Sequence, residues 1–237
     1  FMAGYGNTWS NGKSVYTQLK QDADGHDLDP TDPDNWTVPT PIYRNDASLL
    51  NGNKQLAATA SGGVGMSLDM TYFQDADGRS YYAWQQLGAT YIATMDPKDP
   101  AHVTSSPVRI VTPEYAWNAA IAEGPNVTMR DGKLYLMFSG SGVGKTYTTG
   151  LAVADAAGSD LTDPASWTAL NYPIQKSGPF NGEMQLGTGH GMWSEDEDGN
   201  QIYVFHAYAT KNLGSVNATG RDMFVRRVHW AADGMPV

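Results

Sequence analysis

An Asp-Gly pair that recurs along the chain is the feature that most constrains the fold. Each copy stands between two runs of apolar, β-branched or aromatic residues, and the copies are Asp77-Gly78, Asp131-Gly132 and Asp198-Gly199. Such a pair between such runs is the strongest short-range signal of a β-hairpin, because glycine accepts the positive φ of a tight turn. Another strand-like run follows each hairpin, at residues 91–94, 150–154 and 223–228. The sequence therefore predicts a repeated antiparallel unit of at least three strands.

A second repeat marks the connections between these units. The segment Thr31-Asp32-Pro33-Asp34-Asn35-Trp36 matches Thr162-Asp163-Pro164-Ala165-Ser166-Trp167. In both, Asp-Pro starts a turn and the tryptophan can anchor the next strand. The Asp-Gly pairs at 77, 131 and 198 lie 54 and 67 residues apart, somewhat more than the ~40–50 residues of a regular four-stranded propeller blade. These spacings predict propeller blades with long loops.

The repeats predict an all-β chain that forms a single β-propeller domain over residues 1–237. The propeller is expected to be of the five-bladed type, with the first blade and the start of the second blade missing from this chain. The expected units are residues 1–43, 68–112, 122–174 and 187–237. The opening residues, Phe1-Met2-Ala3-Gly4-Tyr5, are typical of the middle of a strand. Closing the sheet into a ring removes exposed edges, and we expect these units to be too few to close. Outside the strands, only residues 114–122 have helix-like composition.

Composition limits the class of partner. Fifteen basic and 25 acidic residues give a net charge of −10, so the attraction to phosphate on which nucleic-acid binding depends is absent. Neutral or cationic partners are expected. The chain has no cysteine and 41% hydrophobic residues, enough for a core, and its apolar runs are far shorter than the ~18 residues of a membrane span. Compartment stays open, because secreted proteins need no disulfides.

Residues 139–146 match part of the sequence motif of a phosphate-binding loop. They end in Gly144-Lys145-Thr146, but Ser139 stands where the motif needs its first glycine. The motif also has to open a helix whose N-terminus holds the phosphate, whereas residues 147–151 look like a strand. We therefore expect a glycine-rich hairpin loop and no nucleotide site.

Two carboxylates and one histidine occupy equivalent places in successive units. Asp69 and Glu123 stand at the openings of two units, and His190 stands at the same relative place in the last one. Since innermost strands line the channel of a propeller, these side chains are expected to converge at one end of it. Paired carboxylates across a pocket suit glycoside hydrolysis, in which an acid protonates the leaving oxygen. The alternative for Asp69 is a turn-forming or solvated carboxylate.

The remaining candidates are aromatic residues and histidines. Trp84, Trp193 and Trp9 could bind substrate by stacking on a sugar ring, or could anchor blades in the core. His206 and His229 lie within strand patterns and are expected to be packed or hydrogen-bonded. His26 and His102 are expected in loops.

Together these segments resemble glycoside hydrolase family 43. Residues 122–125 with 131–135 and 138–141 are similar to the blade that carries the general acid, and residues 68–72 to the blade of its pKa modulator. Residues 187–190 are similar to the fifth-blade turn whose histidine faces a calcium ion in the channel. Residues 91–96, 112–117 and 226–230 are similar to members of the arabinofuranosidase type. The resemblance covers nearly the whole chain.

The resemblance implies an inverting glycosidase acting on arabinose- or xylose-containing polysaccharides. It makes Glu123 the general acid, Asp69 the pKa modulator and His190 the residue facing structural Ca²⁺. It gives no counterpart of the general base, an Asp on the first blade, and Asp22, Asp24 and Asp46 are not at strand starts. A missing N-terminal segment or a second chain would then complete the propeller and supply the base. We predict an α-L-arabinofuranosidase, with a β-xylosidase or a non-catalytic carbohydrate-binding propeller as alternatives.

Overall fold

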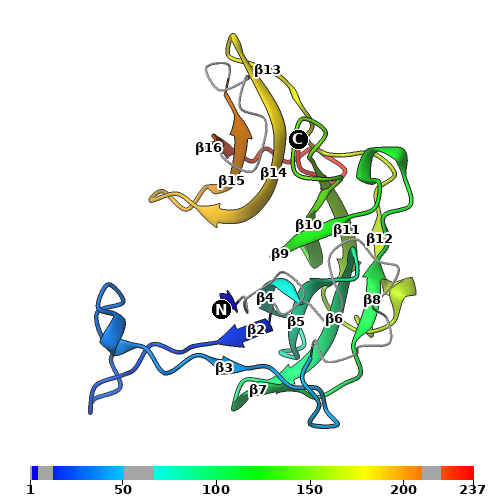
Figure 1. Cartoon of the computed structure of the whole chain (residues 1–237). Helices are drawn as coiled ribbons and strands as arrows, with labels where there is room; N and C mark the ends of the chain where they lie inside the picture. Colours follow the sequence, from blue (N-terminus) through cyan, green and yellow to red (C-terminus); the bar gives the residue numbers. More distant parts are fainter. Residues whose placement is uncertain (1, 5–12, 51–66, 210–219) are drawn as a thin grey trace.

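The computed structural model of the chain describes residues 2–4, 13–50, 67–209 and 220–237, and in these residues it is built of antiparallel sheets (Figure 1). The first sheet contains β1 (Met2–Gly4), β2 (Lys13–Tyr16) and β3 (Thr40–Pro41). The second sheet contains β4 (Leu68–Gln74), β5 (Ser80–Gln86), β6 (Ala89–Asp96), β7 (Asp99–Val103) and β8 (Val108–Val111). The third sheet contains β9 (Ala122–Arg130), β10 (Lys133–Gly140), β11 (Thr148–Asp155) and β12 (Thr168–Ala169). The fourth sheet contains β13 (Gly178–Phe180), β14 (Glu183–Glu195), β15 (Gln201–Tyr208) and β16 (Asp222–Arg227).

Successive sheets pack face to face, which confirms the predicted propeller type of all-β fold. Strand β10 shows why: Leu134, Leu136 and Phe138 pack toward the second sheet, while Tyr135 and Met137 pack toward the fourth. Neighbouring side chains of a strand point to opposite faces, so a strand buried on both faces has to be apolar throughout. A third cluster, which includes Trp84, joins the second sheet to the region of the first.

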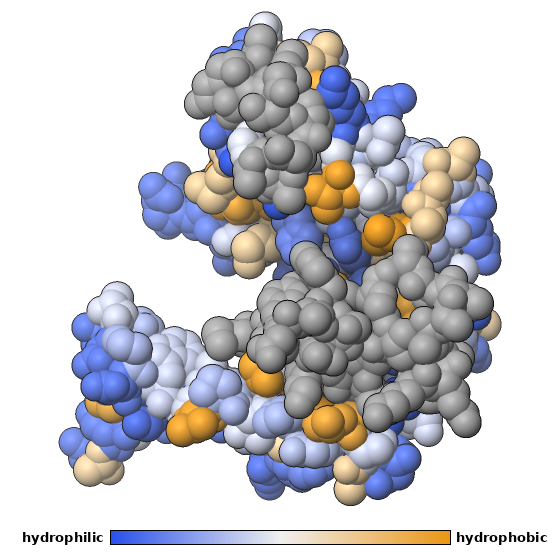
Figure 2. All heavy atoms as spheres, viewed as in Figure 1, coloured by the Kyte–Doolittle hydropathy of each residue, from blue (hydrophilic) through white to orange (hydrophobic). Residues whose placement is uncertain are grey.

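The sheets follow one another around a curve that stays open between the fourth sheet and the first (Figure 1). In the space-filling view this opening is a notch between the upper and lower parts of the molecule (Figure 2). Strands β4, β9 and β14 contact one another in turn along the inner side of this curve. They are the strands on which the candidate residues lie.

The Asp-Gly hairpins are confirmed. Asp131 and Gly132 both have positive φ, 47° and 75°, as a two-residue type I′ turn requires. They join β9 to β10, with Arg130 opposite Lys133. Gly78 and Gly199 have positive φ in the longer turns between β4 and β5 and between β14 and β15.

The repeated Asp-Pro segments form matching 3-10 turns, η2 (Pro33–Asn35) and η5 (Pro164–Ser166). Asp32 and Asp163 each accept a hydrogen bond from the main-chain N–H two residues later, at 2.9 Å. The indole N–H of the tryptophan that ends each segment donates to a carbonyl six residues earlier. The shared sequence therefore encodes a shared local structure.

Two further expectations have clear outcomes. The helix expected at residues 114–122 is wrong: this segment contains only η4 (Ala116–Asn118), and β9 begins at Ala122. The main-chain N–H of Asn118 donates to the carbonyl of Tyr115 at 3.2 Å, which closes a single turn, and the Asn118 side chain accepts from the N–H of Tyr115 at 2.9 Å. The segment 139–146, which partly matches a phosphate-binding loop, is followed by strand β11 and not by a helix, as expected.

The boundaries of the observed sheets can be compared with those of the predicted units. The fourth sheet begins at Gly178 with β13, earlier than the unit expected from residue 187. The grouping of all units into a single domain stays a prediction. Within the described residues, no helix has the length and apolar character needed to cross a membrane.

Candidate active site

Asp69, Glu123 and His190 each lie where the pairing of an innermost strand is irregular. The register of β4 against β5 shifts between Leu68 and Thr71, and that of β14 against β15 shifts between Gly189 and Met192. The pairing of β9 with β10 shifts next to Ser139, the partner of Glu123. Such bulges bend a strand and re-aim its side chains, and they are common beside active sites.

The backbone at these bulges adopts conformations that side chains disfavour. Asp69 and His190 have φ of 56° and 49°, in the left-handed region, and Gly124 after Glu123 has φ of 59°. Left-handed backbone at a residue other than glycine costs free energy and persists only where the surroundings impose it. The equivalent irregularity in three successive sheets therefore turns three polar side chains toward one another.

The contacts between these residues place them in one cluster. The main-chain N–H of Gly124 donates to Asp69 Oδ2 at 3.1 Å, and His190 Nε2 lies 3.7 Å from Asp69 Oδ1. The Tyr147 hydroxyl donates to Glu123 Oε1 at 2.5 Å and lies 3.2 Å from His190 Nδ1. The structure thus brings together all three residues that the repeat positions singled out.

The electrostatic surroundings favour the protonated form of Glu123. Burial raises the pKa of Glu123 above its ordinary value of 4.5, and the charge of Asp69 raises it further. The hydrogen bond from Tyr147 and the positive charges of His190 and Arg221 act in the opposite direction without cancelling the rise. A carboxyl group that holds its proton toward neutral pH can act as a general acid.

Sequence reasoning missed several members of the cluster. Tyr147 is buried just before β11, and Ser139 accepts from the main-chain N–H of His190 at 2.6 Å. His206 stacks on Tyr147, with ring centroids 5.7 Å apart, and its Nε2 lies 2.8 Å from Arg221 Nη1. Burial above all, and then Arg221 and His190, lowers the pKa of His206 to about 4, so this imidazole is neutral at physiological pH. We expected His206 to be packed or hydrogen-bonded. It is packed, and its ring lies against Tyr147 of the candidate site.

Stacking of Trp84 or Trp193 on a sugar ring is not supported by the structure. Trp84 is 0% exposed and donates from its indole N–H to Gln86 at 3.1 Å. Trp193 is 8% exposed and donates to the carbonyl of Tyr135 at 3.1 Å. Both rings fill spaces between sheets, where they anchor the blades. Trp9 lies outside the described residues.

Among the described residues, few oxygen ligands for a calcium ion lie beside His190. Calcium takes six to eight oxygen ligands, whereas this position offers an imidazole with the Asp69 carboxylate 3.7 Å from it. The Nδ1 atom of His190 is already beside the Tyr147 hydroxyl. A calcium ion at His190 stays a prediction of the family resemblance.

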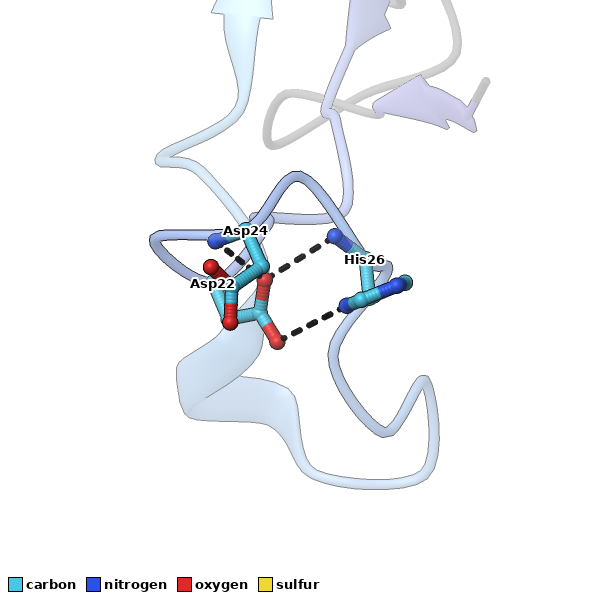
Figure 3. A group of neighbouring side chains, drawn as sticks. All are labelled: Asp22, Asp24 and His26. Atoms are coloured by element: carbon cyan, nitrogen blue, oxygen red, sulfur yellow. Dashed lines mark hydrogen bonds and ion pairs between the residues drawn. The ribbon is translucent and has the colours of Figure 1, made fainter.

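A second group with metal-ligand chemistry lies far from this cluster in the chain. Asp22, Asp24 and His26 have ligand atoms within 4.8 Å of one another (Figure 3). Asp22 Oδ1 accepts from the main-chain N–H groups of Asp24 and His26, both at 2.9 Å, and all three residues are exposed. This is the hydrogen bonding of an Asx turn. Asp46 is likewise a turn residue, since it accepts from the main-chain N–H of Ser48 at 2.9 Å.

Comparison with known proteins identifies the family. The family model of glycosyl hydrolases family 43 matches residues 52–236. The chain belongs to this family. An extracellular exo-α-(1→5)-L-arabinofuranosidase of Streptomyces avermitilis is 32% identical over 183 residues, which are 72% of this chain and 37% of that protein. An α-L-arabinofuranosidase 43 of Humicola insolens is 32% identical over 184 residues, with the same shares. The chain thus spans well under half the length of these relatives.

Solved structures of the family share the fold. An α-L-arabinofuranosidase from Lactobacillus brevis has a TM-score of 0.69 and 25% sequence identity, over 94% of this chain and 70% of that one. A thermostable family-43 glycoside hydrolase has a TM-score of 0.65 and 21% identity, over 95% of this chain and 70% of that one. These similarities support the propeller arrangement of the sheets.

Proposed function

We propose that this family 43 chain carries the acid half of an α-L-arabinofuranosidase site. The observation that carries the proposal is the position of Glu123, whose carboxyl is partly buried beside Asp69 and has a raised pKa. The names of its relatives support arabinofuranosides as the substrate class. The proposed substrates are arabinose-containing oligosaccharides or polysaccharides of the plant cell wall.

The proposed mechanism assigns a role to each side chain. Glu123 delivers its proton to the glycosidic oxygen as the bond to the anomeric carbon breaks, so that the leaving group departs as a neutral alcohol. Asp69 disfavours the ionised form of Glu123 through like-charge repulsion and holds the main chain at Gly124. Water attacks the anomeric carbon from the opposite face, and a general base takes its proton. No residue of this sequence matches the family position of that base.

The unassigned base gives a second candidate function. A propeller with the same pocket but no base would bind arabinose-containing glycans without cleaving them. A β-xylosidase is a weaker alternative, since a xylan β-1,4-xylosidase from Bacillus halodurans with a solved structure is 16% identical and supports the fold alone.

One experiment separates these functions. Azide is an anionic nucleophile that needs no base, so it can replace activated water. The chain is incubated with 4-nitrophenyl α-L-arabinofuranoside or 4-nitrophenyl β-D-xylopyranoside, with and without sodium azide. We expect cleavage of the arabinoside, increased by azide, with inverted arabinofuranosyl azide as product. Binding of arabino-oligosaccharides without cleavage in either condition would favour the binding function, and preferential cleavage of the xyloside would favour the xylosidase.

A further inference from the structure

Tyr147 is a buried phenol that the proposed function leaves without a role. The residue is 0% exposed, and its hydroxyl lies between Glu123 and His190. Burial, and then the charge of Glu123, raises the pKa of Tyr147 well above its ordinary value. The hydroxyl therefore keeps its proton and acts as a donor at any pH at which the protein works.

The ring of Tyr147 is held in one position. It stacks on His206 with an angle of 9° between the rings, and the main-chain N–H of Tyr147 donates to the carbonyl of Gly144 at 3.2 Å. A Cβ atom on Gly189 would lie 2.5 Å from Cδ1 of Tyr147. The absence of a side chain at Gly189 therefore allows the ring to lie against β14. A ring packed in this way keeps the hydroxyl oxygen in place between Glu123 and His190.

The hydrogen bonds around the hydroxyl have a direction. The single hydroxyl proton points to Glu123 Oε1, which is the closer atom at 2.5 Å and, when ionised, the stronger acceptor. The Tyr147 oxygen then accepts from His190 Nδ1 at 3.2 Å, which places a proton on Nδ1 of His190. His190 is itself fixed by its main-chain N–H, which donates to Ser139.

We infer that Tyr147 is a positioning residue that reserves Oε1 of Glu123 and leaves Oε2 as the oxygen that delivers the proton. This inference rests on the proposed role of Glu123 as the acid. The hydrogen bond from the Tyr147 hydroxyl ends on Oε1. In a neutral carboxyl group the carbonyl oxygen is the better acceptor, so a donor at Oε1 places the O–H on Oε2.

The proton transfer follows from this assignment. The Oε2–H bond breaks, its electron pair stays on Oε2, and the proton bonds to the glycosidic oxygen. The bond between the anomeric carbon and the glycosidic oxygen breaks, and its electron pair stays on that oxygen. The nucleophile supplies the electron pair for the new bond to the anomeric carbon. This nucleophile is azide in the assay, or water whose proton a carboxylate base takes. Glu123 is then ionised, and the hydrogen bond from Tyr147 becomes charge-assisted.

The test compares Tyr147→Phe with a matched control, Tyr203→Phe. Tyr203 is also a buried tyrosine between sheets, but its hydroxyl bonds to Thr149 at 2.6 Å, away from Glu123. The sequence has five glutamates, so carbon NMR with ¹³C-labelled glutamate can follow the titration of Glu123, assigned with Glu123→Gln. Loss of a donor to the ionised form should raise the pKa of Glu123 by about 1 unit in Tyr147→Phe and leave it unchanged in Tyr203→Phe.

The second readout is the azide assay with two leaving groups. Tyr147→Phe should slow cleavage of an alkyl arabinofuranoside, which needs protonation, about tenfold or more, and a dinitrophenyl arabinofuranoside much less. A folded Tyr147→Phe with an unchanged or lower pKa of Glu123, or with equal losses on both substrates, would overturn the inference. Glu123→Gln that cleaves the alkyl substrate as fast as the wild type would instead reject the proposed acid, whatever the NMR result for Tyr147→Phe.

Discussion

Asp69 on β4 accepts a hydrogen bond from the main-chain N–H of Gly124 on β9, at 3.1 Å. The bond ties the residue that follows Glu123 to a carboxylate of the neighbouring sheet. Asp69 thus acts on Glu123 in two ways, since its charge raises the pKa of the acid and its oxygen holds the acid's main chain in place. The two effects can be separated by substitution.

Asp69→Asn should lower the pKa of Glu123. The amide oxygen of asparagine can still accept from Gly124, but the negative charge that disfavours ionisation of Glu123 is gone. We expect a fall of up to about 1 unit in the ¹³C titration of Glu123, and a shift of the alkaline limb of activity to lower pH. Asp22→Asn, in an exposed turn, is the control. A pKa of Glu123 that stays constant or rises in Asp69→Asn would show that charge repulsion is not the effect of Asp69.

Gly189→Ala should destabilise the protein through Tyr147. The new methyl group would lie 2.5 Å from the ring, and overpacking of this kind costs about 1–3 kcal/mol of unfolding free energy. Gly142→Ala is the matched control, since a Cβ there meets no heavy atom within 4 Å. Urea unfolding of the two variants should separate them clearly. Equal midpoints would mean that the ring of Tyr147 moves freely and is not held by β14.

His206 should make the fold sensitive to acid. Its pKa is lowered from 6.5 to about 4, with burial as the main cause. Between these values the unfolded chain binds a proton that the folded chain does not, so stability falls as the pH is lowered from 6.5 toward 4. His206→Phe keeps a ring against Tyr147 but cannot titrate. We expect it to lose less unfolding free energy between pH 7 and pH 5 than the wild type.

The control for that comparison is His26→Gln, because the His26 side chain is 78% exposed. Urea midpoints at the two pH values provide the measurement. If His206→Phe and the wild type lose stability to the same extent, the imidazole of His206 does not govern the acid response.

The sequence predicted the structure correctly where a few neighbouring residues determine the local conformation. The turn at Asp131-Gly132 depends on the φ of two residues, and both have the predicted sign. Asp69, Glu123 and His190 were found because the repeat places them at equivalent points, and equivalent strands meet on the inner side of the curve. The expected helix at 114–122 failed because the backbone leaves the helical conformation after one turn: Ala120 has a positive φ of 70°, and the chain then joins β9.

The rest of the site depends on packing between sheets. Tyr147 reaches Glu123 from the third sheet only because Gly189 of the fourth leaves room for its ring. Nothing near residue 147 in the sequence signals this contact. Packing between sheets also hides residues that the sequence presents as candidates. Trp84 and Trp193 are aromatic residues that could stack on sugars, but both are buried between sheets. Which face of a strand another sheet covers cannot be predicted from the strand alone.

The central claim, that Glu123 is the proton donor, is tested most directly by Glu123→Gln in the azide assay on two α-L-arabinofuranosides. The same substitution at an exposed glutamate of β14, Glu183→Gln, is the control. A dinitrophenolate leaves without protonation, whereas an alkoxide needs it. We expect Glu123→Gln to lower the rate of cleavage of the alkyl arabinofuranoside about 100-fold or more, and to lower the rate on the dinitrophenyl substrate by a much smaller factor. Equal losses on the two substrates, or no loss on the alkyl one, would contradict this claim.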